Sequence, residues 1–173
     1  MKSGQFSAGP PQGPLAPLPR ESGSVSPKAD EVKSAGTIFQ WPLRVYWEDT
    51  DAGGIVFYAN YLKFFERSRT EWLRSLGIEQ QRLRESTGGM FVVTETRLRY
   101  LRPARLDDAL TVTARLIEKG RASLIIGQSA LLKSERGSLL LCEGTIRIGW
   151  VDAASLKPAR IPASLLDRLE TTT

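Results

Sequence analysis

The segment YANYLKFFERSRTEWLRSLGI, residues 58–78, decides the fold because it predicts one long helix with a broad apolar side. Residues of this side recur at spacings of three and four, which places their side chains on one helix face. Leu62 and Leu73 widen the face, and Gly77 is a typical C-terminal stop. The predicted buried face comprises Tyr58, Tyr61, Phe65, Ser68, Trp72 and Leu76.

The segments on both sides of this helix have the pattern of strands. Before it, in FQWPLRVYWE, apolar Leu43, Val45 and Trp47 alternate with other residues at the period of a strand. Short helices are predicted at residues 80–86 and 162–170. Four runs rich in β-branched or aliphatic residues follow the long helix: MFVVTETRLRYLR (90–102), ALTVTARLIEK (109–119), SLIIGQSALLK (123–133) and LLLCEGTIRIGWV (139–151).

The connections between the last three strands are too short for parallel crossovers, so these strands should form an antiparallel meander. One long helix on a five-stranded antiparallel sheet is an α+β, two-layer arrangement. The second face of the sheet and its edges must then be hidden or charged, which favours a dimer.

Residues 1–38 differ in composition from the rest of the chain. They hold six of the ten prolines, with Ser and Gly between them, and few periodic apolar residues. Such a segment buries too little surface to offset the entropy of ordering it. We therefore predict a disordered tail over 1–38 and one folded domain over 39–173.

The chain contains no histidine, and this absence limits its chemistry. Ser–His and Cys–His nucleophile pairs, histidine bases and imidazole metal sites are excluded. Any acid–base catalysis near neutral pH must therefore use carboxylates, Lys, Tyr or backbone dipoles. The single cysteine, Cys142, is predicted in the core together with Trp72 and Trp150. A lone cysteine forms no internal disulfide, which is typical of a reducing, cytoplasmic setting.

The net charge of +5 at pH 7 suits a small polyanionic ligand such as a nucleotide or coenzyme A. Basic residues are interspersed with acids, without a run of four or more, so the pattern does not favour nucleic acid. No apolar stretch approaches the ~18 residues that span a bilayer. The first residues, MKSGQFSAGPPQG, lack the apolar segment of a secretory signal, so we expect no such leader.

The stretch EDTDAGGIVFYANY, residues 48–61, concentrates acids and glycines just before the long helix. It fails as an EF-hand, because glycine falls at the fifth position and Asn60 stands where the twelfth position needs Glu. It also has no dinucleotide or P-loop glycine pattern. A turn or capping role is the simplest interpretation. However, the unpaired N–H groups at a helix N-terminus can bind an oxyanion. A carboxylate beside that N-terminus could then act on an ester or thioester carbonyl without the help of a histidine.

Residues 45–77, VYWEDTDAGGIVFYANYLKFFERSRTEWLRSLG, resemble the signature segment of the 4-hydroxybenzoyl-CoA thioesterase family, and especially its branch of acyl-CoA thioesterases associated with the Tol-Pal system. The resemblance continues through RYLRPARLDDAL and VDAASLKPARIP and covers about residues 39–165. It implies the hotdog fold, in which an antiparallel sheet wraps a long central helix. It also implies homodimers or homotetramers, a coenzyme A thioester as substrate, and no cofactor or metal.

The same resemblance implies residue roles. The family's catalytic carboxylate falls on Asp51, either as nucleophile on the thioester carbonyl or as general base for water. The oxyanion donor falls on the backbone N–H of Tyr58, where the Tol-Pal branch typically carries a histidine. Gly53 and Gly54 would shape the loop around the ligand, whereas the neighbouring Glu48 and Asp49 are predicted to be structural.

Cations are needed for the phosphates of coenzyme A. The turn EKGRAS, residues 118–123, matches the family's basic turn and supplies Lys119 and Arg121, which an exposed hairpin would also explain. Arg97 and Arg99 should share one sheet face, more often a solvated one. Further candidates for phosphate contact are Arg97, Arg99 and Arg102.

The sequence therefore favours an acyl-CoA thioester hydrolase. A second hypothesis is a hydratase or dehydratase with the hotdog fold, but such activities generally rely on a histidine beside a carboxylate. A third hypothesis is a non-catalytic acyl-CoA-binding or scaffold protein of an envelope or lipid-synthesis complex. Asp51 within a full motif favours the hydrolase.

Overall fold

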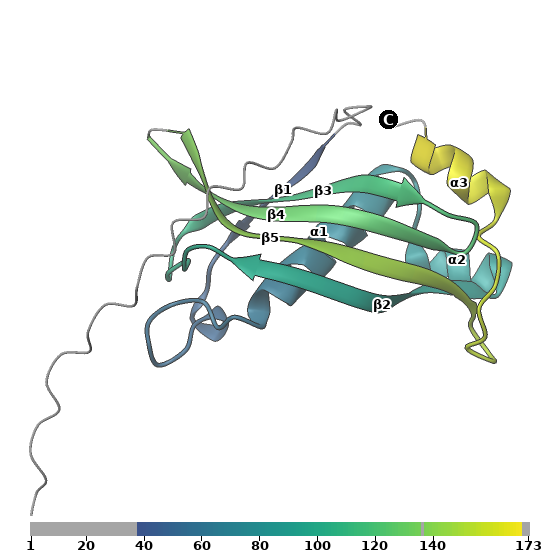
Figure 1. Cartoon of the computed structure of the whole chain (residues 1–173), viewed down its shortest axis with the longest axis horizontal. Helices are drawn as coiled ribbons and strands as arrows, with labels where there is room; N and C mark the ends of the chain where they lie inside the picture. Colours follow the sequence, from purple (N-terminus) through teal and green to yellow (C-terminus); the bar gives the residue numbers. More distant parts are fainter. Residues whose placement is uncertain (1–37, 136, 171–173) are drawn as a thin grey trace, which may run out of the picture. The chain divides into compact units, whose positions relative to one another are not determined.

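The computed structural model describes residues 38–135 and 137–170. Within them a long helix packs on one five-stranded antiparallel sheet, as predicted (Figure 1). Of the predicted tail only Ile38 is among the described residues. The elements are β1 (Phe39–Arg44), a 3-10 turn η1 (Trp47–Asp49), α1 (Asn60–Ser75), α2 (Gln80–Thr87), β2 (Gly89–Tyr100), β3 (Ala109–Lys119), β4 (Ser123–Ser134), β5 (Gly137–Asp152) and α3 (Ala163–Glu170).

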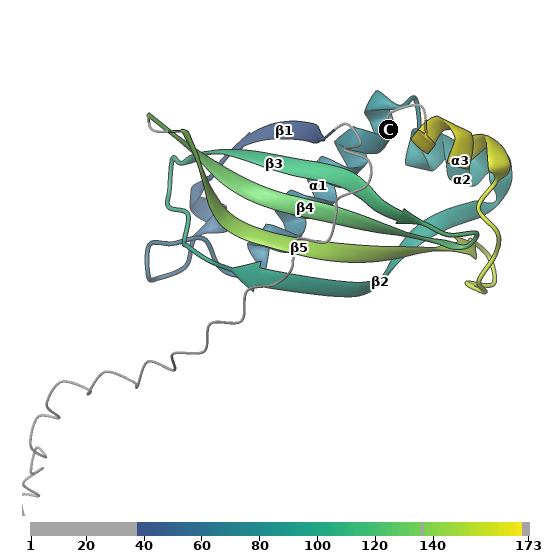
Figure 2. The same cartoon turned by 45° about the horizontal axis from the view of Figure 1, so that its top comes forward.

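The strands lie side by side in the order β1–β3–β4–β5–β2 (Figure 2). Strands β3, β4 and β5 form the predicted meander. The first strand pairs with the free edge of β3, and β2 pairs with the free edge of β5. The two edge strands of the sheet are therefore β1 and β2, which flank the helix connection in the sequence.

Helix α1 covers one face of the sheet and packs against β1, β3 and β4. Two side chains of α1, those of Phe64 and Phe65, are fully buried in the hydrophobic core. The core also contains Trp72, Cys142 and Trp150, as predicted. Two shorter helices, α2 and α3, lie side by side beyond the C-terminal end of α1 (Figures 1 and 2).

Several local predictions were wrong. The helix begins at Asn60, so Tyr58 precedes it and its side chain is 62% exposed. Leu62 does not widen the buried face, because it is 41% exposed. Trp47 is exposed because β1 ends at Arg44 and the chain then turns into η1. The predicted stop is correct, since Gly77 adopts a φ of +72° after the last turn of α1.

Candidate active site

Asp51 lies at an exposed turn between β1 and α1, where Thr50 pairs with Val56 in an antiparallel bridge. Its backbone N–H donates to the Ile55 carbonyl at 3.0 Å, and its carbonyl accepts the N–H of Gly54 at 3.0 Å. Its carboxylate Oδ1 accepts the N–H of Gly53 at 2.8 Å. Among the described residues none donates to the other oxygen, Oδ2, so that oxygen is open to a ligand.

The two glycines have different structural roles in this turn. A methyl group on Gly53 would lie 3.0 Å from Oδ1 of Asp51, which is closer than ordinary packing allows. Gly54 has a φ of +71°, a conformation that favours glycine. The N–H of Gly53 already binds the Asp51 carboxylate, so this glycine positions the carboxylate and does not offer its own N–H to a ligand.

The base of the turn is closed by the carbonyl of Asp49. It accepts the backbone N–H of Phe57 at 2.9 Å and Nδ2 of the Asn60 side chain at 2.9 Å. The Asp49 carboxylate is 2% exposed and accepts the N–H of Tyr46 through Oδ2 at 2.9 Å. Asp49 is therefore structural, as predicted, and ties the chain before Asp51 to the first residue of α1.

Among the described residues the backbone N–H of Tyr58 is unpaired, and it is directed away from α1. The carbonyl of Phe57 accepts the N–H of Asn60 at 2.8 Å. In a planar trans peptide the N–H points opposite to the carbonyl, so the Tyr58 N–H points away from the helix. Within the described part of the chain it has no acceptor. An unpaired N–H at a helix start stabilises negative charge.

A neighbouring segment holds this loop against the sheet. The Val56 N–H donates to the Ala104 carbonyl at 2.9 Å, and the Ala104 N–H donates to the hydroxyl of Tyr61 at 3.1 Å. Ile55 also bridges with Arg105. Burial raises the pKa of Tyr61, so its hydroxyl stays protonated at neutral pH. The backbone of Ala104 thus joins the loop to the first turn of α1.

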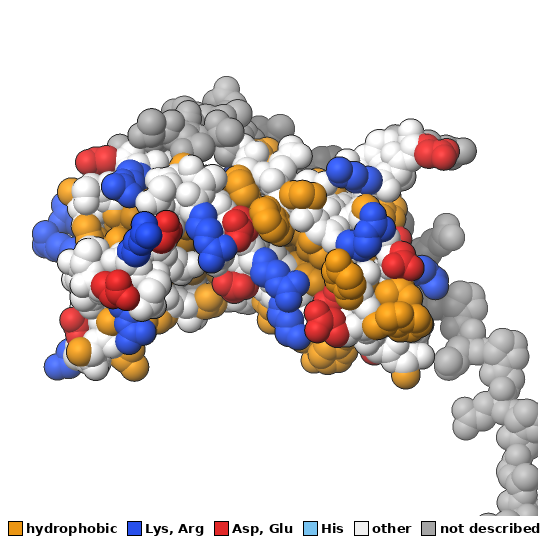
Figure 3. Space-filling view, turned by 180° about the vertical axis from the view of Figure 1, so that it is seen from behind, with side chains coloured by type: hydrophobic (Ala, Val, Ile, Leu, Met, Phe, Trp, Pro, Cys, Tyr) orange, Lys and Arg blue, Asp and Glu red, His pale blue; other side chains and the backbone are white. Residues whose placement is uncertain are grey.

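Exposed aromatic rings surround the start of α1. The Tyr58 ring lies 4.6 Å from the Phe57 ring and 6.2 Å, edge-on, from the Tyr100 ring on β2. Figure 3 shows hydrophobic side chains gathered at the right-hand end of the face that carries α1. Burial, with Cys142 and Tyr58 nearby, raises the pKa of Tyr100. Burial raises the pKa of the Cys142 thiol to about 12, so it is no nucleophile.

The predicted phosphate-binding residues do not lie beside Asp51 in one chain. Val45 and Asp108 join the Asp51 loop to the Ala109 end of β3, whereas Lys119 is the last residue at its other end and Arg121 lies in the turn that follows. The strand has 11 residues, and at ~3.3 Å per residue it extends roughly 33 Å. Figure 1 shows the loop at the left and the β3–β4 turn at the right.

The other cationic candidates also lie outside this site. Arg97 and Arg99 are on the face opposite α1, where they pair with Glu95 at 2.7 Å and Glu143 at 3.6 Å. There they line a groove of about 650 Å³ on the sheet. Arg102 donates to the Leu140 carbonyl at 3.2 Å. For Arg97 and Arg99, the ion pairs fit the solvated sheet face that their alternation favoured.

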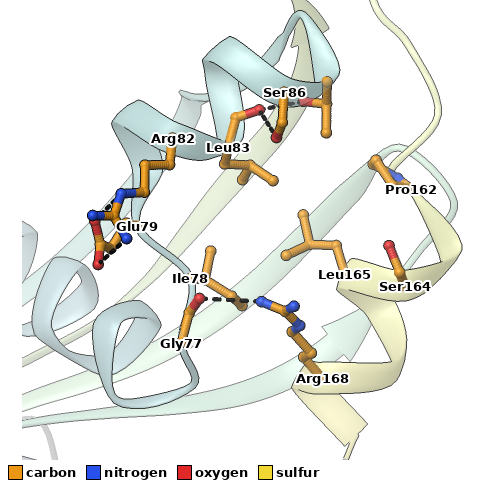
Figure 4. A pocket seen from close by; sticks show the side chains of 11 residues that line it. Gly77, Ile78, Glu79, Arg82, Leu83, Ser86, Pro162, Ser164, Leu165 and Arg168 are labelled. Atoms are coloured by element: carbon orange, nitrogen blue, oxygen red, sulfur yellow. Dashed lines mark hydrogen bonds and ion pairs between the residues drawn. The ribbon is translucent and has the colours of Figure 1, made fainter.

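A separate cavity of about 300 Å³ lies between α2 and α3. Its lining includes apolar Ile78, Leu83 and Leu165, and Arg168 extends across it to the Gly77 carbonyl at 3.1 Å (Figure 4). None of the predicted site residues lines it. Because the cavity lies beyond the C-terminal end of α1, it is remote from Asp51.

Within residues 38–135 and 137–170, no group of three or more His, Cys, Asp or Glu side chains could hold a metal ion. None of the helices in this part of the chain is long and apolar enough to cross a membrane.

Sequence reasoning missed Asn60 and Ala104, which organise the loop. Asn60 is 6% exposed and Ala104 is fully buried. The preference of asparagine for N-caps would not have singled out Asn60, because the N-cap of α1 is Ala59 and the Asn60 side chain donates to the Asp49 carbonyl. No local signal marks Ala104, because its contribution is made by backbone atoms that only the tertiary structure brings to the loop.

Comparison with known proteins identifies the family. The profile of the Thioesterase-like superfamily matches residues 45–169. An acyl-CoA thioesterase, YbgC, of Haemophilus influenzae is 42% identical over 124 residues, covering 72% of this chain and 88% of that protein. The structure of a probable thioesterase from Bartonella henselae is 31% identical, covers 73% of this chain and 100% of its own, and has a TM-score of 0.68.

A 4-hydroxybenzoyl CoA thioesterase variant, solved with 4-hydroxybenzoyl CoA, superimposes with a TM-score of 0.72 over 76% of this chain and 98% of its own. At 18% identity this likeness concerns the fold alone. The hotdog fold is therefore confirmed. The length and identity of the sequence matches establish more than the fold, and the chain belongs to the Thioesterase-like superfamily.

Proposed function

We propose that residues 39–173 form an acyl-CoA thioesterase in which Asp51 and the backbone N–H of Tyr58 are the catalytic groups. The observation that carries the proposal is one short loop presenting both an open carboxylate oxygen and an unpaired N–H at a helix start. The family, and the name of the Haemophilus influenzae relative as an acyl-CoA thioesterase, support this reaction class.

The reaction needs one base and one oxyanion donor. In the general-base route the Asp51 carboxylate takes a proton from water as the water oxygen adds to the thioester carbonyl carbon. In the nucleophilic route the carboxylate adds to that carbon itself, and water hydrolyses the resulting anhydride. In both routes the Tyr58 N–H stabilises the oxyanion of the tetrahedral intermediate. Its collapse breaks the C–S bond, and the CoA sulfur leaves and takes up a proton.

Binding of coenzyme A requires a second copy of the chain in this proposal. Lys119 and Arg121 are separated from Asp51 by the length of β3, roughly 33 Å at ~3.3 Å per residue. We therefore assign the phosphate contacts at one Asp51 to the basic turn of a partner subunit in a homodimer or homotetramer. The long edge strand β2, with unpaired backbone groups, favours such an assembly.

The proposed cellular location and protein partners rest on the sequence. The lone cysteine supports a cytoplasmic enzyme without disulfides. Resemblance to the Tol-Pal branch extends the proposal to envelope or lipid-synthesis protein partners. Where that branch typically carries a histidine this chain has Tyr58, whose contribution in this proposal is its backbone N–H, unpaired within the described part of the chain.

The test compares wild type with Asp51→Asn on aromatic, short-chain and long-chain acyl-CoAs. Asparagine keeps an oxygen that can accept the Gly53 N–H, so the turn should persist while the base is lost. We expect turnover to fall at least ~10²-fold. Glu48→Gln is the matched control, because this exposed carboxylate lies three positions upstream, and it should keep wild-type activity.

Two outcomes contradict the proposal. A wild type that hydrolyses none of the esters is not a thioesterase of these substrates, and if it still binds them it is an acyl-CoA-binding or scaffold protein. An Asp51→Asn variant with full activity removes Asp51 from the chemistry.

A further inference from the structure

We infer that Asn60 is the positioning residue that sets the distance and orientation between the Asp51 carboxylate and the Tyr58 N–H. This inference rests on the proposed function. It adds to that function a residue that contacts neither substrate nor the reacting atoms.

Asn60 forms hydrogen bonds to both ends of the loop between Asp49 and Asn60, which carries Asp51 and Tyr58. Its backbone N–H donates to the Phe57 carbonyl at 2.8 Å, and its side-chain Nδ2 donates to the Asp49 carbonyl at 2.9 Å. The first bond fixes the peptide plane that contains the Tyr58 N–H, because a trans peptide is rigid and planar. The second fixes the chain two residues before Asp51.

Burial makes these bonds specific. Asn60 is 6% exposed, so water cannot readily replace the Asp49 carbonyl as partner of its amide. The same carbonyl accepts the Phe57 N–H at 2.9 Å, which closes the loop into one hydrogen-bonded ring from Asp49 to Asn60. Loss of Nδ2 leaves this ring with a single bond at its base.

The expected consequence is a loss of alignment and not of substrate binding. The turn around Asp51 keeps its own bonds to Gly53, Gly54 and Ile55, so the carboxylate remains correctly formed. With one of the two hydrogen bonds to the Asp49 carbonyl lost, however, the turn is held less firmly and shifts relative to the Tyr58 N–H. Because attack and oxyanion stabilisation occur in one transition state, the penalty falls on kcat.

Asn60→Asp is the sharpest test. The substitution keeps the shape of the side chain and the backbone N–H, but places a carboxylate oxygen where Nδ2 donated, facing a carbonyl oxygen. We expect kcat for a good acyl-CoA substrate to fall at least about tenfold with KM within about twofold of wild type. Asn60→Ala, which removes the donor without adding charge, should show the same split between kcat and KM and serves if the aspartate variant fails to fold.

Ser68→Ala is the matched control on the same helix. Ser68 is fully buried, and its hydroxyl donates to the Val112 carbonyl at 3.2 Å, remote from the loop. It should lose a comparable hydrogen bond and lower the melting temperature, while kcat stays at the wild-type value. A merely structural Asn60 would behave in the same way as Ser68.

The outcomes separate this inference from the proposed function. If Asn60→Asp and Asn60→Ala keep wild-type kcat while Asp51→Asn loses activity, Asn60 is not a positioning residue but the thioesterase assignment stands. Equal kcat losses in the Asn60 and Ser68 variants would also overturn the inference. An inactive wild type instead contradicts the proposed function itself.

Discussion

Asp51 is held by its own backbone neighbours rather than by a second side chain. One carboxylate oxygen accepts the Gly53 N–H at 2.8 Å, and the residue's N–H and carbonyl bind Ile55 and Gly54. A chain without histidine has no imidazole to orient the carboxylate that we propose as catalytic. The turn supplies that orientation through the N–H of Gly53.

Gly53→Ala should reduce turnover with little effect on folding. The added methyl would lie 3.0 Å from Oδ1 of Asp51, so the carboxylate must move. We expect kcat for an acyl-CoA to fall at least about tenfold, since catalysis depends on alignment within about an ångström. Steady-state kinetics and a thermal melt measure the two effects.

Gly149→Ala is the control for that experiment, because its methyl would meet a side-chain atom of Thr94 at 3.2 Å, away from the loop. Unchanged kcat in the Gly53 variant, or an equal loss in both variants, would show that crowding at Asp51 does not matter.

At the scale of elements, the pairing of β2 with β5 completes the sheet and brings Tyr100 beside Tyr58. This pairing depends on close approach at Gly144, which lies opposite Leu98. A methyl group on Gly144 would overlap the backbone carbonyl of Arg97. A backbone atom within a paired strand cannot move aside as a flexible side chain can.

Gly144→Ala should therefore destabilise the fold by about 1–3 kcal/mol through overpacking. Urea unfolding monitored by tryptophan fluorescence measures the change. Gly149→Ala in the same strand should cost less than ~1 kcal/mol, because the methyl of Thr94 that it meets can shift. Equal stability losses for the two variants would contradict this account of the β2–β5 contact.

For the whole molecule, the decisive fact is the separation of the two groups of predicted site residues. Asp51 and Tyr58 lie at one end of β3, and Lys119 and Arg121 lie at the other, roughly 33 Å away at ~3.3 Å per residue. One extended ligand in contact with both groups would have to span the sheet. A twofold assembly removes this requirement, because it can bring opposite ends of two chains together.

Subunit mixing tests this arrangement. Asp51→Asn and Arg121→Ala proteins with different affinity tags are co-expressed, and the mixed dimer is isolated with both tags. We expect kcat/KM for an acyl-CoA to recover to roughly half that of wild type, because one of two symmetric sites then holds both native residues. If the mixed dimers are no more active than the Arg121→Ala protein alone, the proposed arrangement is wrong. Either both residues then belong to a site within one chain, or Arg121 does not bind the substrate.

Much of the fold could be predicted from local pattern. The spacing of Tyr61, Phe65, Ser68 and Trp72 predicted α1, and short connections predicted the β3–β4–β5 meander. The start of α1 was placed too early, at Tyr58, because periodicity alone cannot distinguish a helix from the turn that leads into it. The positions of β1 and β2 at opposite edges could not be derived, since local pattern does not show which strands pair across the two helices after β1 or across residues 101–108 after β2.

By itself, the sequence determined the element order, the absence of histidine chemistry and, through family resemblance, Asp51 and the Tyr58 N–H as candidates. Only the tertiary structure decided which groups meet. It joined Asp49 to Asn60 through a buried hydrogen bond of 2.9 Å and separated Arg121 from Asp51 by the length of β3. The physical reason is that periodicity encodes which side chains are buried, whereas the distance between two polar groups depends on backbone pairing between remote segments.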